Sequence, residues 1–203
     1  MTILAFTCIR NEGPFLLEWI AYHRLIGVTD FLIFSNDCTD GSDRLLSQLA
    51  RHGVLRHIPQ EIRPGKSPQW QALQQVAKGG ATAGHDWAMF TDVDEFAVIH
   101  TGQRTLADAI AAMPGDADAI ALPWRLFGAA GRAEFHDAPV TAQFTRSAPA
   151  NLYHPIAGRN IKTLYRPDRF HKPGVHRPKR IAGGGLPNWY DGAGRRLPDR
   201  FAA

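Results

Sequence analysis

Three carboxylates stand directly after a short apolar run in this sequence. Residues 88–91 offer no polar face and are too few for a helix, so they predict a buried strand that leads into Asp92, Asp94 and Glu95. Open α/β sheets bind ligands at the carboxyl ends of their strands. Like charges so close together are unfavourable unless a cation offsets them, and carboxylates suit Mg²⁺ or Mn²⁺ shared with substrate phosphates. We therefore predict a metal site that receives a diphosphate, although a solvated acidic loop or helix cap is the alternative for such a motif taken alone.

Strand and helix patterns alternate along the first half of the chain and would position these carboxylates. Helices are indicated where apolar residues recur at three- and four-residue steps behind a Pro or Ser, and strands where short apolar runs end in polar turns. The predicted strands are 3–9, 31–34, 54–58 and a run from about 87. The predicted helices begin at Pro14, after Ser42 as a cap, and at Ser67. Such alternation predicts one Rossmann-like α/β domain, with a mostly parallel central sheet flanked by helices.

The second half of the chain has a weaker pattern. Residues 106–113 predict a helix and residues 119–124 a strand, and the stretches 140–145 and 161–165 predict further, antiparallel strands. Pro and Gly dominate from His171 onward, a glycine run at 183–185 indicates a flexible loop, and we find no closing element before Ala203.

Composition narrows the class of protein. The chain has 203 residues, of which 44% are hydrophobic, so it is long enough for one globular domain with a core. No apolar run approaches the roughly 18 residues that span a bilayer, and the first residues do not resemble a signal peptide. The two cysteines, Cys8 and Cys38, do not make a disulfide framework. We therefore expect a cytoplasmic protein.

Charge is distributed unevenly along the chain. The net charge is +4, but the stretch 159–203 alone holds 11 Lys and Arg against 3 Asp and Glu. A basic stretch behind an acidic one indicates a contact with something anionic, such as a diphosphate, an anionic acceptor or the inner face of a membrane. A solvated basic tail is the alternative. We expect no nucleic-acid partner and leave open a peripheral association with membranes.

Four motifs occur in a characteristic order. They are Arg10-Asn11-Glu12 after the first strand, the Trp-containing helix 14–23, the polar loop 36–42 and the Asp-x-Asp-Glu-Phe motif 92–96. In this order the sequence resembles GT-A-fold glycosyltransferases, most of all a bacterial group related to family two. The resemblance covers roughly the first half of the chain and extends more loosely to residues 124–128 and 162–167. It implies transfer of a sugar from a nucleotide-diphosphate-sugar to an acceptor hydroxyl.

The resemblance also implies roles for single residues in metal binding. In the family the second aspartate of the motif contacts the metal, here Asp94, while the first, here Asp92, meets the ribose or a metal-bound water. A distal histidine often completes the site. Of the two candidates, His171 and His176, the pattern Val-His-x-Pro favours His176 as the third metal ligand. Mn²⁺ and Mg²⁺ are not distinguished by these ligands.

Donor recognition is expected at the ends of the first two strands. This nominates Arg10, Asn11, Glu12 and Asn36, with Lys66 reaching the donor from the start of the third helix. Many relatives read the base with an aspartate at the end of the second strand, and here that position holds a serine. A UDP-sugar is favoured as donor, and the identity of the nucleotide stays open.

The catalytic base of an inverting transferase would be a carboxylate facing the acceptor hydroxyl. Glu134 and Asp137 lie in the region where acceptors bind in the family, and either could act as this base. Glu95 could instead position the acceptor or brace the metal ligands. The expected catalytic set is thus Asp92, Asp94 and Glu95 with Glu134 and Asp137.

These expectations divide the chain into a donor-binding half, 1–100, and an acceptor-side half, 101–203, which the natural protein could continue past Ala203. The expected acceptor is a glycan or a lipid-linked hydroxyl. Two other functions remain: a non-catalytic nucleotide-sugar or glycan binding module of the same fold, and a sugar-phosphate nucleotidyltransferase. The second ranks lower, because such enzymes begin with a Gly-rich basic loop that residues 10–14 do not provide.

Overall fold

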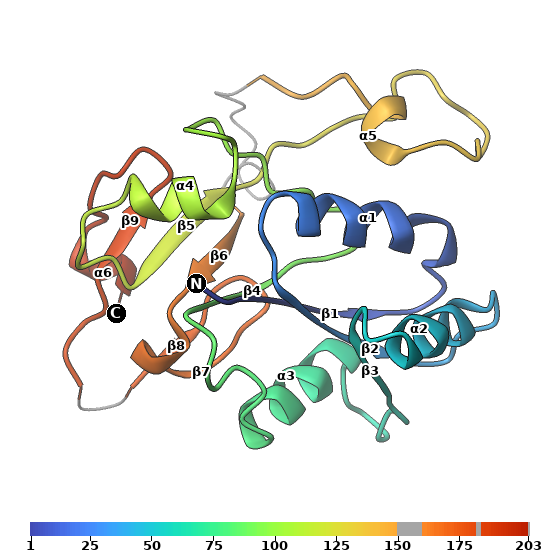
Figure 1. Cartoon of the computed structure of the whole chain (residues 1–203), viewed down its shortest axis with the longest axis horizontal. Coiled ribbons are helices and arrows are strands. Elements are labelled where there is room, and N and C mark those ends of the chain that lie inside the picture. Colours follow the sequence, from blue (N-terminus) through green and yellow to red (C-terminus); the bar gives the residue numbers. More distant parts are fainter. Residues whose placement is uncertain (150–159, 182–183, 203) are drawn as a thin grey trace.

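A seven-stranded sheet runs through the molecule, a computed structural model that describes residues 1–149, 160–181 and 184–202 (Figure 1). Its strand order is β3-β2-β1-β4-β6-β5-β9, and every neighbouring pair is parallel except the two made by β6. The expected α/β architecture, with a mostly parallel central sheet flanked by helices, is therefore confirmed.

The helices and strands of the first half follow the predicted alternation. In chain order they are β1 (Ile3–Ile9), α1 (Gly13–Leu25), β2 (Asp30–Ser35), α2 (Ser42–Arg51), β3 (Arg56–Pro59), α3 (Pro68–Lys78) and β4 (Trp87–Phe90). The second half contributes α4 (Leu106–Ala111), β5 (Ala119–Pro123), α5 (Val140–Gln143), β6 (Ile161–Tyr165), a 3-10 turn (Pro167–Arg169), β7 (Phe170–Lys172), β8 (Lys179–Arg180), β9 (Trp189–Asp191) and α6 (Asp199–Ala202).

The central strands are apolar on both faces because both faces are covered. Along β1, Ile3 and Ala5 point to one hydrophobic cluster, and Leu4 and Phe6 point to the other. Helices α1, α2 and α4 supply the first cluster, and α3 and α6 contribute to the second. Parallel strands buried on both sides give continuous rather than alternating apolar runs, which is the pattern of the sequence.

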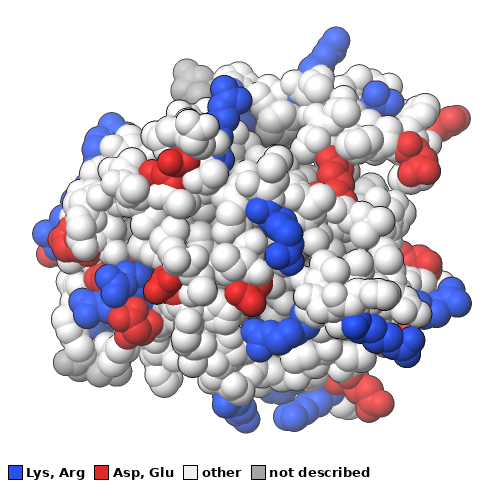
Figure 2. All heavy atoms as spheres, in the orientation of Figure 1, with Lys and Arg blue, Asp and Glu red and all other residues white. Residues whose placement is uncertain are grey.

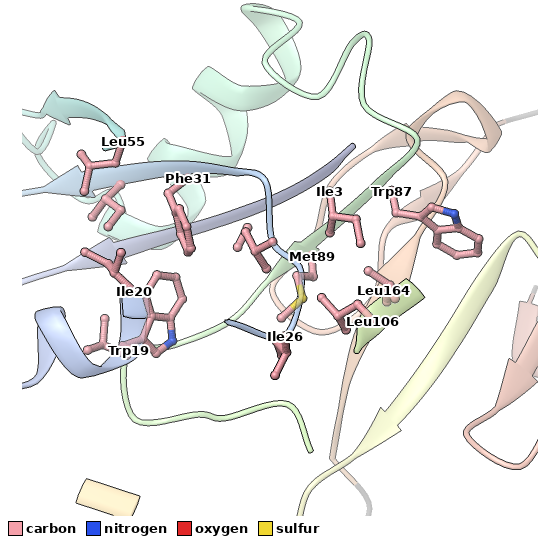
Figure 3. Packing of buried hydrophobic residues seen from close by; sticks show 14 of the residues in the cluster. Ile3, Trp19, Ile20, Ile26, Phe31, Leu55, Trp87, Met89, Leu106 and Leu164 are labelled. Atoms are coloured by element: carbon pink, nitrogen blue, oxygen red, sulfur yellow. The ribbon is translucent and has the colours of Figure 1, made fainter. Parts of the chain in front are cut away.

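The larger cluster joins α1 to the middle of the sheet. Trp19 is fully buried and packs its ring edge-to-face against Phe31, with centroids 5.7 Å apart. Figure 3 shows this pair together with Met89 on β4 and Leu164 on β6, side chains that come from both halves of the chain. The two halves therefore share one core.

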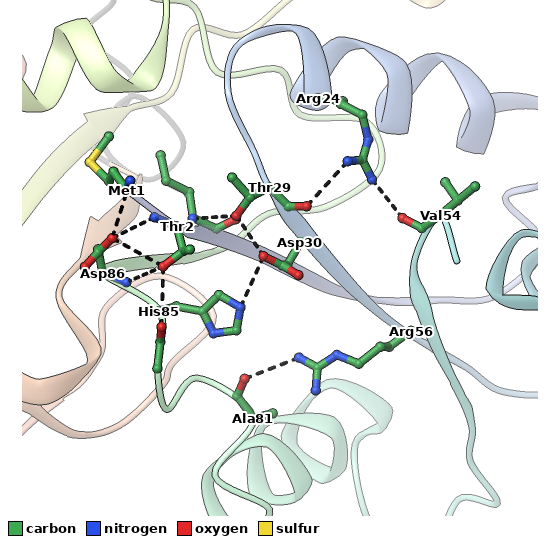
Figure 4. Close-up of polar contacts among 12 residues, drawn as sticks. Met1, Thr2, Arg24, Thr29, Asp30, Val54, Arg56, Ala81, His85 and Asp86 are labelled. Atoms are coloured by element: carbon green, nitrogen blue, oxygen red, sulfur yellow. Dashed lines mark hydrogen bonds and ion pairs between the residues drawn. The ribbon is translucent and has the colours of Figure 1, made fainter. Parts of the chain in front are cut away.

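The amino edge of the sheet is fastened by polar contacts (Figure 4). The carboxylate of Asp86 accepts hydrogen bonds from the backbone N–H and the hydroxyl of Thr2, at 2.7 and 3.3 Å. The hydroxyl of Thr29 accepts from the N–H of Ile3 at 2.8 Å and donates to Asp30 at 2.8 Å. These contacts tie together the starts of β1, β2 and β4, which leaves the opposite, carboxyl edge for ligands.

Three sequence expectations about secondary structure are wrong. Residues 140–145 contain helix α5 rather than a strand, because the N–H groups of Val140 and Thr141 are held by a carboxylate of α1. Ser42 is the first residue of α2 rather than its cap; Gly41 precedes it in the left-handed conformation, with φ of 89°. The chain also has closing elements after the glycine run, because β9 pairs with β5 and α6 packs beside it.

Antiparallel pairing of strand 161–165 is confirmed, since β6 runs opposite to both β4 and β5. Within the described residues, no helix combines the length and the apolar character needed to cross a membrane. Gly183, the first residue of the glycine run, lies outside the described residues.

Candidate functional site

A cavity of about 370 Å³ opens at the carboxyl edge of the sheet. Its walls come from the ends of β1 and β2 and from the start of α3, which is the place expected for a nucleotide. The lining residues are Cys8, Ile9, Arg10, Asn36, Asp37, Ile62, Ser67, Pro68 and Gln69. Arg10 and Asn36 were expected there, and Lys66 is exposed next to the lining residue Ser67. Asp37 also lines the cavity, although the sequence pattern did not predict it as a donor-binding residue.

The turn after β1 is tied to the loop after β2. The side-chain carbonyl of Asn11 accepts the N–H of Thr39 at 2.7 Å, and its amide donates to the Thr39 hydroxyl at 3.1 Å. Asp40 accepts the N–H groups of Gly13 at 3.0 Å and Ser42 at 2.9 Å. Asn11 also takes a left-handed φ of 56°, which its short polar side chain tolerates. Asn11 thus holds the two loops together and is not among the residues that line the cavity.

Ser35, at the end of β2, contacts a histidine on β3. Its hydroxyl lies 2.8 Å from Nε2 of His57, and the Ser47 hydroxyl lies 3.1 Å from Nδ1 of the same ring. Burial lowers the pKa of His57. The serine that stands where many relatives have an aspartate is thus bonded within the sheet, and the nearest carboxylate that lines the cavity is Asp37.

The acidic motif forms a closed turn after β4. The N–H of Glu95 donates to the carbonyl of Asp92 at 3.0 Å, and the N–H of Asp92 donates to the Glu95 carboxylate at 3.0 Å. The Thr91 hydroxyl donates to the same carboxylate at 3.2 Å. These reciprocal bonds fix the backbone of the motif, as in a capping box. Asp94, in the middle of the turn, is exposed.

A lysine from the second half of the chain lies beneath this turn. Lys162 on β6 is 4% exposed, and its Nζ lies 2.8 Å from Asp92 Oδ2 and 3.2 Å from Glu95 Oε2. Burial raises the pKa of Glu95, and the charge of Lys162 opposes that rise. Lys162 lies in the stretch 162–167 that extends the resemblance, but no motif assigns it a role. Only the pairing of β4 with β6 brings the lysine to the motif.

Carboxylates from two strand ends meet at the edge of the site. Glu12 is half-buried, and its pKa is raised by burial and then by the negative charges of Asp94, Asp40 and Asp92. The Nε2 of Gln69, at the start of α3, donates to Asp92 Oδ1 at 3.3 Å and so connects the motif to the cavity wall. The charges of Asp92 and Asp94 thus act on Glu12, although the three side chains do not form one compact group among the described residues.

The expected third metal ligand is placed differently. Nδ1 of His176 lies 3.0 Å from the carbonyl of Ile161, and its ring packs against Trp124 with centroids 5.5 Å apart. Among the residues that the structure describes, no three His, Cys, Asp or Glu side chains form a group that could hold a metal, so His176 is not assembled with the aspartates. Its role as a ligand stays a prediction.

The donor set nevertheless fits a cation that is shared with a ligand. Asp94 offers an exposed carboxylate beside Asp92 and Glu12, whose charges act on one another. Mg²⁺-like ions are typically held by one or two carboxylates together with substrate phosphates rather than by a complete protein cage. The described residues therefore suit a divalent cation that arrives with a diphosphate.

The two expected base candidates lie on an exposed loop. Glu134 and Asp137 precede α5, and both are exposed. The loop rests on α1, where Phe135 contacts Phe15 edge-to-face at 6.4 Å. Helix α5 lies above α1 in Figure 1, at the side of the molecule where β1 ends. The loop is thus near the carboxyl edge.

The fold is that of an α/β protein with a mostly parallel sheet, and its candidate site lies at the carboxyl edge of that sheet. The sequence profile of glycosyltransferase family 92 matches residues 8–191, so the chain belongs to glycosyltransferase family 92. This agrees with the glycosyltransferase that the motifs implied, whereas the expected likeness to a bacterial group related to family two is not confirmed.

Plant proteins of this family are similar to the chain. A family 92 protein of Oryza sativa subsp. japonica is 29% identical over 167 residues, which cover 80% of this chain and 26% of that protein. A family 92 protein of Ricinus communis is 33% identical over 106 residues, covering 51% of this chain and 18% of that protein. The chain thus spans about a quarter or less of the length of these relatives.

Solved glycosyltransferase structures resemble it more distantly. Staphylococcus aureus TarS has a TM-score of 0.48 and 15% identity, covering 82% of this chain and 28% of that chain. A Pyrobaculum calidifontis mannosyltransferase, solved with GDP-Man and Mn²⁺, has a TM-score of 0.43 and 19% identity, covering 59% and 34%. At this level of similarity the likeness fixes neither donor nor acceptor.

Proposed function

We propose that the protein transfers a sugar from a nucleotide-diphosphate-sugar, with a UDP-sugar favoured, to a hydroxyl of a glycan or lipid-linked acceptor. Metal dependence and inversion of the anomeric centre are part of this proposal, as is action in the cytoplasm or at the inner face of a membrane. Membership of glycosyltransferase family 92 supports the reaction class. The cavity and the carboxylates at the carboxyl edge of the sheet support the donor site.

The cavity suits the nucleoside part of such a donor. Its volume, about 370 Å³, is in the range of small-molecule pockets. Asn36 and Asp37 line it with amide and carboxylate groups that can read the edge of a base, and Arg10 can contact a phosphate or ribose. The N-terminus of α3, which begins at Pro68, also faces this space, and helix N-termini favour phosphate groups.

The observation that carries the proposal is the position of the acidic turn: Gln69, which lines this cavity, donates to Asp92, and Asp94 stands exposed in the same turn. Negative charges that act on one another, as those of Asp94 and Asp92 act on Glu12, favour binding of a cation. A bound Mn²⁺ or Mg²⁺ would supply positive charge that stabilises a diphosphate leaving group. Asp94 would contact this ion, with Asp92 adjacent to it in an ion pair with Lys162, and Lys66 and Arg10 would contact the phosphates.

The acceptor would enter between this edge and the loop that precedes α5. We propose Glu134 or Asp137 as the base that removes the proton from the attacking hydroxyl. Substituting one of the two by its amide is then expected to lower turnover by about a hundredfold or more, with the Kd for the donor unchanged. If Glu134→Gln and Asp137→Asn both keep full turnover, the base lies elsewhere, with Glu95 as the next candidate.

The donor site is tested by calorimetric titration of a panel of nucleoside diphosphates, with and without Mn²⁺. We expect one nucleotide to bind in a metal-dependent manner, and Asp94→Asn to weaken that binding at least about tenfold, as loss of a metal contact does. Asp168→Asn, which makes the same change at an exposed position far along the chain, is the matched control. A folded wild type that binds no nucleotide would contradict the proposal.

A hydrolysis assay distinguishes an enzyme from a non-catalytic binding module. A UDP-sugar incubated with the protein and Mn²⁺ is slowly hydrolysed by a transferase even without acceptor, and the released nucleotide can be followed by chromatography. Saturable binding without any release would instead identify a non-catalytic nucleotide-sugar binding protein of the same fold.

A further inference from the structure

Lys162 is a buried cation for which the proposed reaction has no direct use. It is 4% exposed, and its ammonium lies over the ring of Phe90, 4.9 Å from the centroid. Removing an ammonium from water costs several kcal/mol unless carboxylates and hydrogen bonds compensate for it. The compensation comes from Asp92 at 2.8 Å and Glu95 at 3.2 Å, which makes the lysine and the acidic motif one electrostatic unit.

Two carboxylates of the motif are paired within the protein, whereas the third is exposed. Both oxygens of Asp92 are engaged, Oδ2 by Lys162 and Oδ1 by Gln69. Glu95 Oε2 is engaged by Lys162 and by two donors of its own turn. Asp94 is exposed, and its side chain takes part in no hydrogen bond or ion pair found within the described part of the chain. The one internal ammonium therefore pairs with two of the acids and leaves the third without a basic partner among the described residues.

We propose that Lys162 is a positioning residue that keeps Asp92 and Glu95 turned into the protein and leaves Asp94 as the carboxylate offered to a divalent cation. The inference rests on the proposed function in taking a nucleotide diphosphate as the second source of ligands. With one carboxylate available and an ammonium close by, the nucleotide-free protein binds the cation weakly. The two phosphates of the donor then supply the missing negative charge, so cation and donor bind together.

The test is a titration of nucleotide-free protein with Mn²⁺ alone, with free Mn²⁺ followed by electron paramagnetic resonance. Lys162→Met keeps the length of the side chain and removes its charge, which releases Asp92 and Glu95. We expect this variant to bind Mn²⁺ at least about tenfold more tightly than the wild type. A lysine that only supports the fold would give the opposite result, because its removal would disorder the turn. Unchanged or weaker Mn²⁺ binding by Lys162→Met overturns the proposal.

Two control variants define the effect. Lys162→Arg keeps the positive charge and is expected to bind Mn²⁺ as weakly as the wild type. Lys78→Met makes the same change of charge at the exposed end of α3 and is also expected to match the wild type. Tight binding by Lys162→Arg would show that charge is not what matters at this position, and would contradict the proposal.

The wild type gives a second measurement that does not depend on the variant folding. Its dissociation constant for Mn²⁺ without nucleotide is expected to be roughly millimolar, as for sites with few carboxylates. Micromolar binding by the nucleotide-free wild type would overturn the inference. Neither Mn²⁺ titration contains nucleotide or sugar, so failure of the donor site in calorimetry and failure of the Lys162 proposal are separate results.

Discussion

Phe96, the last residue of the acidic motif, anchors the motif on α1. Its ring packs edge-to-face on Tyr22 at 5.1 Å and stacks on His23 at 6.1 Å, and the Tyr22 hydroxyl donates to the carbonyl of Ala97 at 2.9 Å. The sequence alone showed only that an aromatic residue ends the motif. These contacts give Phe96 a structural role, because they fix the path of the chain directly after the three carboxylates.

His23, beneath this aromatic contact, is held neutral. Its ring is fully buried, Nδ1 donates to the Trp19 carbonyl at 2.9 Å, and Nε2 has no hydrogen-bond partner among the described residues. Burial lowers the pKa of His23 to about 4, because a protonated ring would lose its hydration without gaining an acceptor for Nε2.

Acid is therefore expected to destabilise the protein through His23. In the unfolded chain this histidine takes up a proton near pH 6.5, whereas the folded chain resists protonation down to about pH 4. The unfolded state binds more protons in this window, so the free energy of unfolding falls as the pH falls from 6.5 towards 4, by up to about 3 kcal/mol. Urea unfolding at several pH values measures this loss.

A comparison of variants isolates the contribution of His23 from that of the carboxylates. His23→Leu should show a smaller loss of stability across the same pH window than the wild type. His100→Leu, which changes an exposed histidine, should follow the wild type. Equal pH dependence of wild type and His23→Leu would mean that the ring is protonated in the folded state.

At the level of elements, α5 owes its existence to α1. Glu18 on α1 accepts hydrogen bonds from the N–H of Val140 at 2.5 Å, the N–H of Thr141 at 3.1 Å and the Thr141 hydroxyl at 2.7 Å. A carboxylate at the start of a helix satisfies N–H groups that have no partner within the helix. The loop that carries Glu134 and Asp137 is therefore fastened to α1 at its far end.

Glu18→Ala is expected to release this loop. Loss of three hydrogen bonds to a charged group should lower the free energy of unfolding by about 1–2 kcal/mol, after allowance for partial exposure. Amide hydrogen exchange of residues 132–143 should become faster, while exchange in the central strands stays unchanged. Glu61→Ala, at an exposed position, is the matched control. Unaltered exchange in the loop would show that Glu18 does not hold it.

At the level of the whole molecule, the two expected halves share one sheet. Strand β6 of the second half lies between β4 and β5, where its antiparallel pairing with β4 places Leu164 opposite Met89. The division into a donor-binding half and an acceptor-side half is thus a proposal about function. Structurally, the second half supplies Lys162 to the acidic motif and places helix α5 against α1.

The C-terminal segment closes the sheet rather than trailing from it. The guanidinium of Arg177 lies over the rings of Trp189, at 5.2 Å, and Phe201, at 4.1 Å, and so joins the segment before β8 to β9 and α6. Cation–π contacts of this kind are typically worth about 0.5–2 kcal/mol. At least one basic residue of the stretch 159–203 thus packs inside the fold and is not part of a free basic tail.

Ion pairs use further basic residues of that stretch. Arg169 pairs with Asp118 at 2.9 Å, and Arg195 pairs with Asp191 at 2.8 Å. On the face shown in Figure 2, Lys and Arg side chains are scattered among acidic ones instead of gathering in one patch. Contact with an anionic membrane or acceptor therefore remains a proposal whose support is the net charge of the segment alone.

The architecture, and the edge of the sheet that carries the candidate site, could be predicted from the pattern of apolar and polar residues. Buried parallel strands must be apolar on both faces, so β1, β2 and β4 were visible as runs, and the polar residues after them had to meet at one edge. Arg10, Asn36 and the Asp92–Glu95 turn follow from that rule, because each stands directly after a strand. These are local signals, and local signals can be read along a chain.

The hydrogen-bond and ion-pair partners of these residues could not be predicted, because they depend on how distant parts of the chain pack together. Lys162 reaches Asp92 across 70 positions of sequence, and Glu18 reaches Val140 across 122. Neither contact leaves a periodic pattern, since each depends on the pairing of β4 with β6 or on the docking of a loop on α1. The sequence shows the negative charge of the acidic motif. The lysine that pairs with two of its three carboxylates reaches the motif only because β6 pairs antiparallel with β4.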